Sequence, residues 1–466
     1  MRTLVTLSVA VFLSCSEQPT VDLMLVGGMV VDVETDSEPS RLDIAIDDGR
    51  IVALGETLGR RYRATETIDA SGRFIIPGLA DMHSHFGNGI LPPGEDDTTQ
   101  VLARHLYYGN TTVLNLGSFQ AWPERIDELR AQMAAGHLEG PRLLAVGSLI
   151  TRLGSHPTTT IYAPPVQKRI AEIVAAAPAT GPIDLTPLRA TTVVRTSADV
   201  TEEVQRVGEW GADAIKITVE SGPGEFGVHP RMTPEMIAAA VEAARPFGIP
   251  VLCHVSALPE LEDCIAHGAD GAVHGVTPDE PLPDDLEGRM IDRGFTLIPT
   301  AAMFDGWARL ATDPAWSEDP FLGETLSEGE RDWLGSPEMI ERMAWDDDAP
   351  VRRLGEHILK LHDLGGEVVA GTDTGNPYRF AGYALHEEME FYVRSGLSER
   401  AALATATVGA ARLVGAEDAW GSIRQGLAAD LLVLEANPLR AIENTRTIVE
   451  VIRSGRRVDR GALPVR

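Results

Sequence analysis

The sequence contains little cysteine and comparatively little positive charge. Three cysteines occur among 466 residues, too few for the disulfide framework of a small secreted domain. Asp and Glu (69 residues) outnumber Lys and Arg (40 residues), which gives a formal net charge of −29. A chain this acidic repels the phosphates of nucleic acids and the surfaces of anionic membranes. We therefore expect no nucleic-acid partner, and solubility is the simplest explanation of the charge.

Hydrophobic runs long enough to cross a membrane are also missing. The apolar run Leu4–Leu13 is short and has the form of a signal-peptide core, so residues 1–15 are predicted to be a signal peptide. Phe12–Cys15 (FLSC) resembles a bacterial lipoprotein cleavage site, which implies export and a lipid anchor at Cys15, either periplasmic or at the membrane. The alternative is a true start at Met24, which would leave the protein in the cytoplasm.

Two cysteines remain in the body of the chain. Cys253 lies in a predicted strand and Cys264 in the helix that follows it. Two cysteines in an exported protein could pair, but nothing around them resembles a disulfide framework, so we expect buried free thiols.

Short β-rich segments separated by turn residues occur at both ends of the chain. They are VDLMLVGGMVVDVE (21–34), LDIAIDDGRIVALG (42–55), ADLLVLEANPL (429–439) and TIVEVIRSGRRV (447–458). These segments predict a small β-sandwich domain composed of residues 21–75 and 425–466. Residues 76–424 then form the main domain.

The main domain alternates short apolar strands with helical stretches, a pattern typical of an α/β fold with a parallel sheet. Eight candidate strands occur at 74–85, 111–117, 142–148, 214–218, 250–255, 271–275, 296–300 and 367–375. Eight such units predict a (β/α)₈ barrel of the TIM type, with its active site at the carboxyl ends of the strands.

Two connections in this domain are long, and both follow the carboxyl end of a predicted strand. They cover residues 149–213 and 301–366, and we expect them to lie over the active site. The second connection contains Trp307, Trp316, Trp333 and Trp345. We expect most of these tryptophans to pack within the connection itself.

Six side chains able to bind or bridge metal ions stand at or near the predicted strand ends. They are His83, His85, Lys216, His254, His274 and Asp373. Side chains alternate between the two faces of a strand, so His83 and His85 point the same way. Each residue alone has an ordinary explanation: a satisfied core histidine, an ion-paired lysine, or an aspartate that caps a helix. Their placement in barrel order favours one shared site.

Several motifs resemble a known family. Pro77–His85 (PGLADMHSH) is similar to the PG-h-h-D-x-H-x-H signature of the amidohydrolase superfamily. GAVHG (271–275) and AGTDTG (370–375) resemble its sixth and eighth strands. The segment 419–439 (AWGSIRQGLAADLLVLEANPL) is similar to the returning strand of its sandwich domain. The resemblance covers nearly all of the chain after the signal segment.

Within that superfamily, the chain looks most like the imidazolonepropionase-like and prolidase-like dipeptidase branch. The segments that carry this likeness are 105–117, 211–217 and 382–407. The resemblance implies that His83, His85 and Asp373 hold one zinc ion and that His254 and His274 hold a second. Lys216 would bridge the two ions as a carbamate formed with carbon dioxide. Imidazolonepropionase itself has one metal and lacks this lysine, so Lys216 favours the dipeptidase side.

The implied mechanism is hydrolysis. A water shared by two cations loses its proton near neutral pH and attacks the substrate carbonyl. Asp373 accepts the proton and returns it to the leaving amine, which suits an amide or dipeptide substrate. The alternatives are a deaminase or a cyclic-amide hydrolase with one metal and an unmodified Lys216, and an exported binding protein without catalysis. A homo-oligomer is compatible with the sequence.

Candidate substrate residues follow the third and fourth strands. His156 matches a Gly-Gly-His position that faces the substrate in similar dipeptidases, although Ser155 replaces the second glycine. His229 and Arg231 occur where those dipeptidases carry a substrate-holding aromatic. The guanidinium of Arg231 would suit a substrate carboxylate, and its alternative is an ordinary surface arginine.

Overall fold

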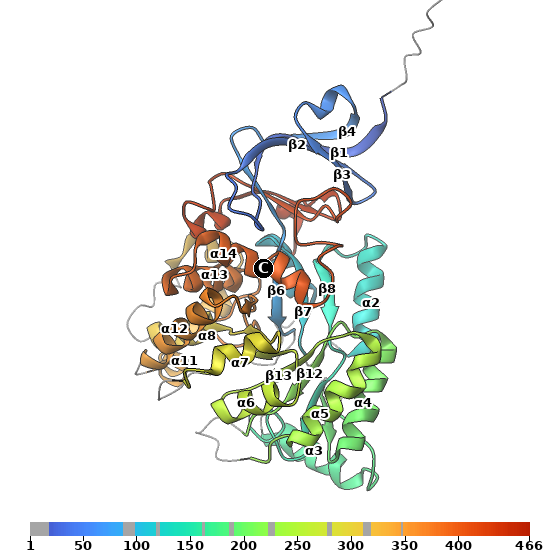
Figure 1. The fold of residues 1–466 in the computed structure, drawn as a ribbon, viewed down its shortest axis with the longest axis vertical. Helices are drawn as coiled ribbons and strands as arrows, with labels where there is room; N and C mark the ends of the chain where they lie inside the picture. Colours follow the sequence, from blue (N-terminus) through green and yellow to red (C-terminus); the bar gives the residue numbers. More distant parts are fainter. Residues whose placement is uncertain are drawn as a thin grey trace, which may run out of the picture.

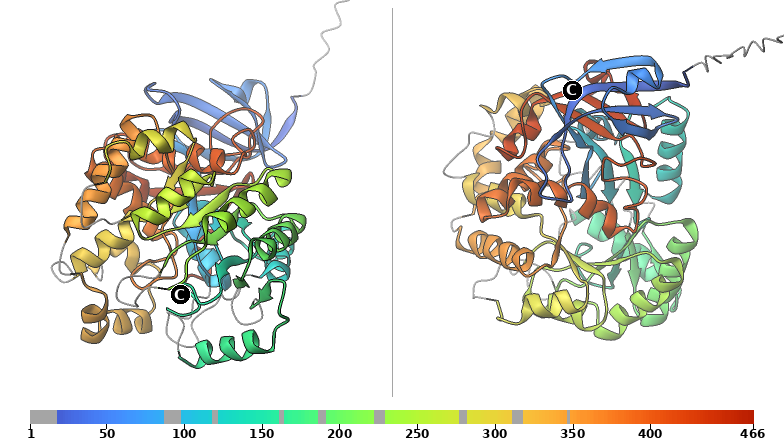
Figure 2. Two further views of the ribbon diagram at one scale, coloured as in Figure 1. Left: turned by 60° about the horizontal axis from the view of Figure 1, so that its bottom comes forward. Right: turned by 45° about the horizontal axis from the view of Figure 1, so that its top comes forward.

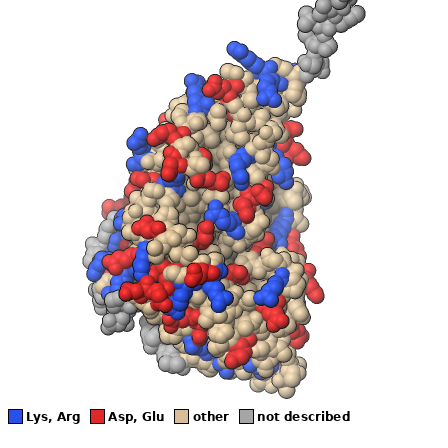
Figure 3. All heavy atoms as spheres, in the orientation of Figure 1, with Lys and Arg blue, Asp and Glu red and all other residues tan. Residues whose placement is uncertain are grey.

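The computed structural model describes residues 18–86, 98–117, 122–160, 164–185, 191–221, 229–276, 282–310, 318–345 and 348–466. The predicted signal peptide with Cys15, and Trp316, lie outside the described residues. Within these ranges, no helix is both long enough and apolar enough to cross a bilayer. On the face shown in Figure 3, acidic and basic side chains are interspersed over the surface.

Strands from both ends of the chain form one sheet, which we call the terminal sheet (Figures 1 and 2). Its strand order is β19-β18-β17-β5-β1-β2-β3, and β4 pairs with β1. The strands are β1 (Thr20–Val30), β2 (Ser40–Asp47), β3 (Arg50–Gly55), β4 (Arg63–Asp69), β5 (Phe74–Pro77), β17 (Leu431–Leu434), β18 (Ile448–Arg453) and β19 (Arg456–Arg457). Pairing of β5 with β17 joins the two ends of the chain. The sandwich form and the domain limits stay predictions.

The predicted strand at 74–85 is two strands in two different sheets. β5 ends at Pro77 in the terminal sheet, and β6 (Leu79–Ser84) begins the main domain. Gly78 lies between them, and its N–H donates to the carbonyl of Asp430 at 2.8 Å. A Cβ atom at Gly78 would lie 2.1 Å from Oγ1 of Thr111, so only glycine fits where the chain changes sheets.

The main domain is an α/β fold in which most strands are parallel and follow chain order. β6 pairs with β7 (Asn110–Asn115), which pairs with β8 (Arg142–Ala145). The other barrel strands are β12 (Ile215–Thr218), β13 (Val251–His254), β14 (Gly271–Val273), β15 (Thr296–Ile298) and β16 (Glu367–Val368). Backbone hydrogen bonds connect the two groups, from Asp213 to Ala145 (2.9 Å) and from Met82 to Ala370 (3.1 Å). The arrangement is consistent with a TIM-barrel-type domain.

The two long connections contain regular structure that the sequence did not reveal. The first holds β9 (Leu149–Arg152), α3 (Pro164–Ala176), β10 (Ile183–Asp184), β11 (Thr191–Val194) and α4 (Ser197–Trp210). β9 pairs with both β11 and β12, so it extends the sheet beside the strand that carries Lys216.

The second connection is helical. It holds α8 (Ala301–Leu310), α9 (Pro320–Gly323), α10 (Glu328–Leu334), α11 (Pro337–Met343) and α12 (Ala349–Asp363). The ring centroids of Trp307 and Trp345 lie 5.9 Å apart, and Trp333 packs against the cluster of Leu310, Leu334 and Tyr378. These three tryptophans therefore pack within their own segment and its neighbours, as predicted.

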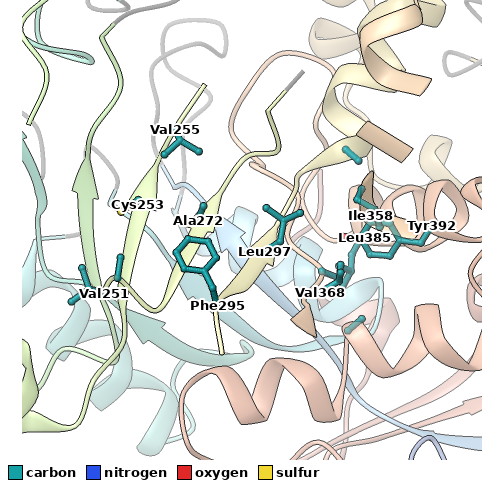
Figure 4. Close-up of a cluster of buried hydrophobic side chains, with 14 of the residues drawn as sticks. Val251, Cys253, Val255, Ala272, Phe295, Leu297, Ile358, Val368, Leu385 and Tyr392 are labelled. Carbon is teal, nitrogen blue, oxygen red and sulfur yellow. The ribbon is translucent and has the colours of Figure 1, made fainter. Parts of the chain in front are cut away.

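Alternation along β13 shows how the strands place functional groups inside the domain. Val251, Cys253 and Val255 pack among the helices in the cluster shown in Figure 4. Leu252 belongs to a second cluster with Val273, Ile298 and Val369. His254 shares the parity of Leu252, so the same alternation turns it to the face of the sheet that carries Leu252.

The remaining helices pack around the strands of the main domain, and Figure 1 labels several of them. They are α1 (Thr98–Tyr107), α2 (Pro123–Ala134), α5 (Pro234–Ala244), α6 (Leu258–Ala266), α7 (Leu286–Asp292), α13 (Tyr383–Ser395), α14 (Glu399–Thr405) and α15 (Val408–Leu413). Cys253 of β13 and Cys264 of α6 form a disulfide. The expectation of two free thiols is therefore wrong, because packing of α6 on β13 brings the two sulfurs together.

Candidate metal centre

The first group of candidate ligands joins the end of β6 to the segment after β16. The Nε2 atoms of His83 and His85 lie 3.1 Å apart. Oδ1 of Asp373 lies 3.3 Å from the first and 3.0 Å from the second. Nδ1 of His85 donates to the carbonyl of Gly117, which leaves the lone pair on Nε2. The three side chains could hold one metal ion.

A second group comes from β13 and β14. Nδ1 of His254 lies 3.2 Å from Nε2 of His274, and the other nitrogen of His274 lies 2.9 Å from Oγ1 of Thr300. Oδ2 of Asp373 lies 3.9 Å from Nδ1 of His274. Asp373 thus contacts both groups, one through each carboxylate oxygen.

Two of these candidate ligands have a strained backbone. His274 has φ of 64° and Asp373 has φ of 56°, in the left-handed region that favours glycine. Such residues cost about 1–3 kcal/mol each and cluster at functional sites. Their conformation aims both side chains from strand ends that would otherwise direct them elsewhere.

Lys216 is buried beside both groups without a hydrogen-bond partner among the described residues. Its side chain is on β12, the residue is 1% exposed, and Nζ contacts no acceptor there. Burial lowers the pKa of Lys216 to about 7, although the charges of Asp373 and Glu220 oppose the shift. A partnerless buried amine is costly. A neutral amine is also the form that reacts with carbon dioxide, so the residue fits a bridging carbamate.

The protonation states also fit a metal site. Burial, and then the charge of Lys216, holds the pKa of His83 and of His254 well below the usual range, so both imidazoles are neutral. Burial likewise lowers the pKa of His274. Burial raises the pKa of Asp373, but its interactions with His274, His85 and Lys216 outweigh burial, and the net pKa is lowered. Neutral imidazoles with a carboxylate suit divalent ions such as zinc.

The three candidate substrate residues lie in different surroundings. The ring of His156 stacks on that of His254 with centroids 4.8 Å apart, so it adjoins the second group. Nδ1 of His229 lies 3.3 Å from Oγ1 of Thr159. Nη2 of Arg231 pairs with Asp263 of α6 at 2.8 Å. His156 thus contacts a candidate metal ligand.

Two carboxylates of the site were missed by sequence reasoning. Oε2 of Glu220 lies 2.5 Å from Nε2 of His254. Asp81 is fully buried and accepts hydrogen bonds from the backbone of His83 and from Thr372. Strand parity was an available signal, because Asp81 shares the face of His83 and Glu220 shares that of Lys216.

The profile described as the amidohydrolase family matches residues 74–458. The chain belongs to the amidohydrolase family. Among curated relatives of this amidohydrolase, the adenine deaminase of Geobacillus kaustophilus (strain HTA426) is 39% identical over 101 residues, which is 22% of this chain and 16% of that protein. The dihydroorotase of Trichlorobacter lovleyi (strain ATCC BAA-1151 / DSM 17278 / SZ) is 37% identical over 75 residues, 16% of this chain and 17% of that protein. These matches thus span less than a fifth of either relative.

Solved structures match the amidohydrolase over nearly its whole length. A Xaa-Pro dipeptidase with bound methionine superposes with a TM-score of 0.71 and 24% identity, covering 94% of this chain and 99% of that chain. A putative prolidase from Bifidobacterium longum superposes with a TM-score of 0.67 and 24% identity, covering 95% of each chain. Molinate hydrolase superposes with a TM-score of 0.69 and 22% identity, covering 96% of each chain. At these identities the likeness shows the fold, and it agrees with the resemblance to prolidase-like proteins.

Proposed function

We propose that this amidohydrolase binds two divalent ions, zinc being the metal its ligands suit, and hydrolyses amide bonds in small peptide-like substrates. His83, His85 and Asp373 would hold the first ion, and His254 and His274 the second. Lys216, as a carbamate, would bridge them. The supporting observation is the burial of Lys216, without a partner among the described residues, beside two converging groups of ligands.

The role of Asp373 follows from its position. Two bound ions would supply a strongly acidified water and an electrophile for the substrate carbonyl. Asp373 reaches His83 and His85 through Oδ1, so its carboxylate stands where the first ion would be held. From there it accepts the proton of the attacking water and returns it to the departing nitrogen. An amide substrate requires this proton transfer because the amine leaves only after its nitrogen is protonated.

A second candidate is deamination or opening of a cyclic amide. The match to adenine deaminase and the match to dihydroorotase favour it, because both relatives share sequence with this chain. The structural similarity to a Xaa-Pro dipeptidase over 94% of this chain supports the dipeptidase reading. A non-catalytic binding protein is the least favoured candidate, because all six candidate ligands and bridging groups are present.

The substrate contacts and the location belong to the same proposal. His156 is the candidate supported by a contact with a metal ligand, and His229 and Arg231 stay candidates from the sequence alone. Export, with a lipid anchor at Cys15, also stays a proposal.

A substrate screen tests the proposed function. The zinc-loaded protein is assayed against dipeptides, N-acyl amino acids, cyclic amides and aminopurines, beside Asp373→Asn as the matched inactive variant. We expect hydrolysis of dipeptides or N-acyl amino acids and a loss of about 10²–10⁴-fold in kcat in Asp373→Asn with its metal retained. Turnover of only cyclic amides or aminopurines would overturn the dipeptidase assignment, and full activity in Asp373→Asn would exclude it as the base.

A further inference from the structure

The two ring nitrogens of His254 face different partners. Nδ1 lies 3.2 Å from Nε2 of His274, on the side where the second ion would be held. Nε2 lies 2.5 Å from Oε2 of Glu220 on the opposite side of the ring. The imidazole thus stands between a candidate co-ligand and a carboxylate.

This arrangement decides which nitrogen carries the proton. A neutral imidazole has one N–H donor and one lone pair. Towards a ring N–H, a carboxylate oxygen is the acceptor, so the contact of 2.5 Å favours a proton on Nε2. The lone pair is then on Nδ1, which faces His274.

Glu220 is buried, and hydrogen bonds hold the backbone on either side of it. The residue is 2% exposed, and its carbonyl accepts a hydrogen bond from Oγ of Ser155 at 3.1 Å. The preceding residue, Val219, donates its N–H to the carbonyl of His254 at 3.0 Å. The following residue, Ser221, donates its N–H and its hydroxyl to Glu260 at 2.8 and 2.9 Å. The contact of Val219 therefore binds this segment to the strand that carries His254, and the contacts of Ser221 bind it to α6.

We propose that Glu220 is a positioning residue: it accepts the Nε2 proton of His254 and thereby directs Nδ1 at the second metal ion. The inference rests on the proposed two-metal site and extends it to a residue outside the ligand set. Partners that orient a metal-bound histidine raise its basicity, and their loss costs about 10- to 100-fold in metal affinity.

Glu220 has one competing role, as a ligand itself. His156, Glu220 and His254 also lie close enough to hold an ion among them. Nε2 of His156 is 3.7 Å from Oε2 of Glu220, whereas Nε2 of His254 is at 2.5 Å. The much shorter second contact is a hydrogen bond, which favours the positioning role.

Nitrogen spectroscopy of the metal-loaded protein separates the two roles without using activity. The chain is labelled with ¹⁵N-histidine and loaded with ¹¹³Cd, and the His254 signals are assigned by their loss in His254→Gln. We expect cadmium coupling at Nδ1 and a proton on Nε2. Coupling at Nε2 would overturn the proposal in favour of direct ligation by this group.

Metal affinities of variants supply the second test. We expect Glu220→Ala to lower the affinity for the second zinc ion about 10- to 100-fold, measured by chelator competition. The affinity for the first ion should not change. Glu220→Gln keeps a neutral acceptor of the same shape, so its affinity for the second zinc ion should lie between that of wild type and that of Glu220→Ala. Glu203→Gln is the control, because Glu203 is also 2% exposed but bonds to Ser148 and Thr192.

The outcomes distinguish this inference from the proposed function. A wild-type protein that binds a single ion would contradict the two-metal site itself. A wild type with two ions, together with unchanged affinity for both in Glu220→Ala, would overturn the role of Glu220 alone.

Discussion

Asp81 binds Thr372 across the junction between the first and last strands of the main domain. Oδ2 of Asp81 lies 2.7 Å from Oγ1 of Thr372, and Oδ1 accepts the N–H of Thr372 at 3.1 Å. Oδ1 also accepts the N–H of His83 at 3.1 Å. One buried carboxylate therefore couples the β6 segment, with its two histidines, to the segment that carries Asp373.

Asp81→Asn should loosen this junction. The new amide places a donor where the carboxylate accepts three hydrogen bonds, so we expect a loss of about 1–3 kcal/mol in the free energy of unfolding. The affinity for the first zinc ion should fall about tenfold, because its ligands come from both sides of the junction. Denaturant unfolding and chelator competition measure the two effects.

The control for this variant is Asp430→Asn. Asp430 is also buried, but it pairs with Arg142 and Arg453 at the terminal sheet. The Asp430→Asn variant should be less stable than wild type but bind metal ions with unchanged affinity. An Asp81→Asn protein that binds both ions as tightly as wild type would show that the junction has no part in the metal site.

Lys216 should be carbamylated when metal ions occupy the site. With ¹³C-bicarbonate and zinc, we expect one carbamate resonance in the ¹³C NMR spectrum, absent in Lys216→Met, which should also lose the second ion. The chain has three lysines, and Lys168 and Lys360 are outside the site. Lys360→Met should therefore keep the resonance. Two bound ions without any carbamate signal would contradict the bridging role.

The sequence predicted the ligand set because those residues obey local rules. His83 and His85 share a strand face, and His254, His274 and Asp373 follow parallel strands whose carboxyl ends meet. Parity with Lys216 could have placed Glu220 on the same face, but its contact with His254 depends on the register that places Thr218 opposite His254, which no local pattern encodes. The same limit applies to β9, which pairs with β12 across a long insertion.

The break at Gly78 and the disulfide were missed for a related reason. The segment 74–85 (FIIPGLADMHSH) is predicted as one strand, and the sheet change depends on Thr111 and Asp430 from distant segments. Cys253 and Cys264 carry no framework signature, and their pairing follows from how α6 packs on β13.

Arg104 and Glu330 form a buried pair that anchors the second long connection to α1. Their contacts are 2.5 Å (Nη1 to Oε1) and 2.8 Å (Nη2 to Oε2), with side chains 7% and 5% exposed. Glu330→Gln leaves the guanidinium without its charge partner, so we expect a loss of about 3–5 kcal/mol in the free energy of unfolding near neutral pH. Glu328→Gln, exposed on the same helix, should change it by less than about 0.5 kcal/mol.

This pair also makes stability depend on pH. Burial raises the pKa of Glu330, but Arg104 outweighs it, so the folded pKa is below the ordinary 4.5. The stabilisation is present above pH 4.5 and is lost as pH falls through the folded pKa. The difference in the free energy of unfolding between wild type and Glu330→Gln should therefore become smaller in acid. A gap that stays constant or widens there would contradict the ion pair.

The two-metal site is tested most directly by anomalous diffraction at the zinc edge from crystals grown with zinc and bicarbonate. We predict two peaks of comparable height, one among His83, His85 and Asp373 and the other beside His254 and His274, with density from Lys216 reaching both. A single peak, or an unmodified Lys216 beside two ions, would contradict the account.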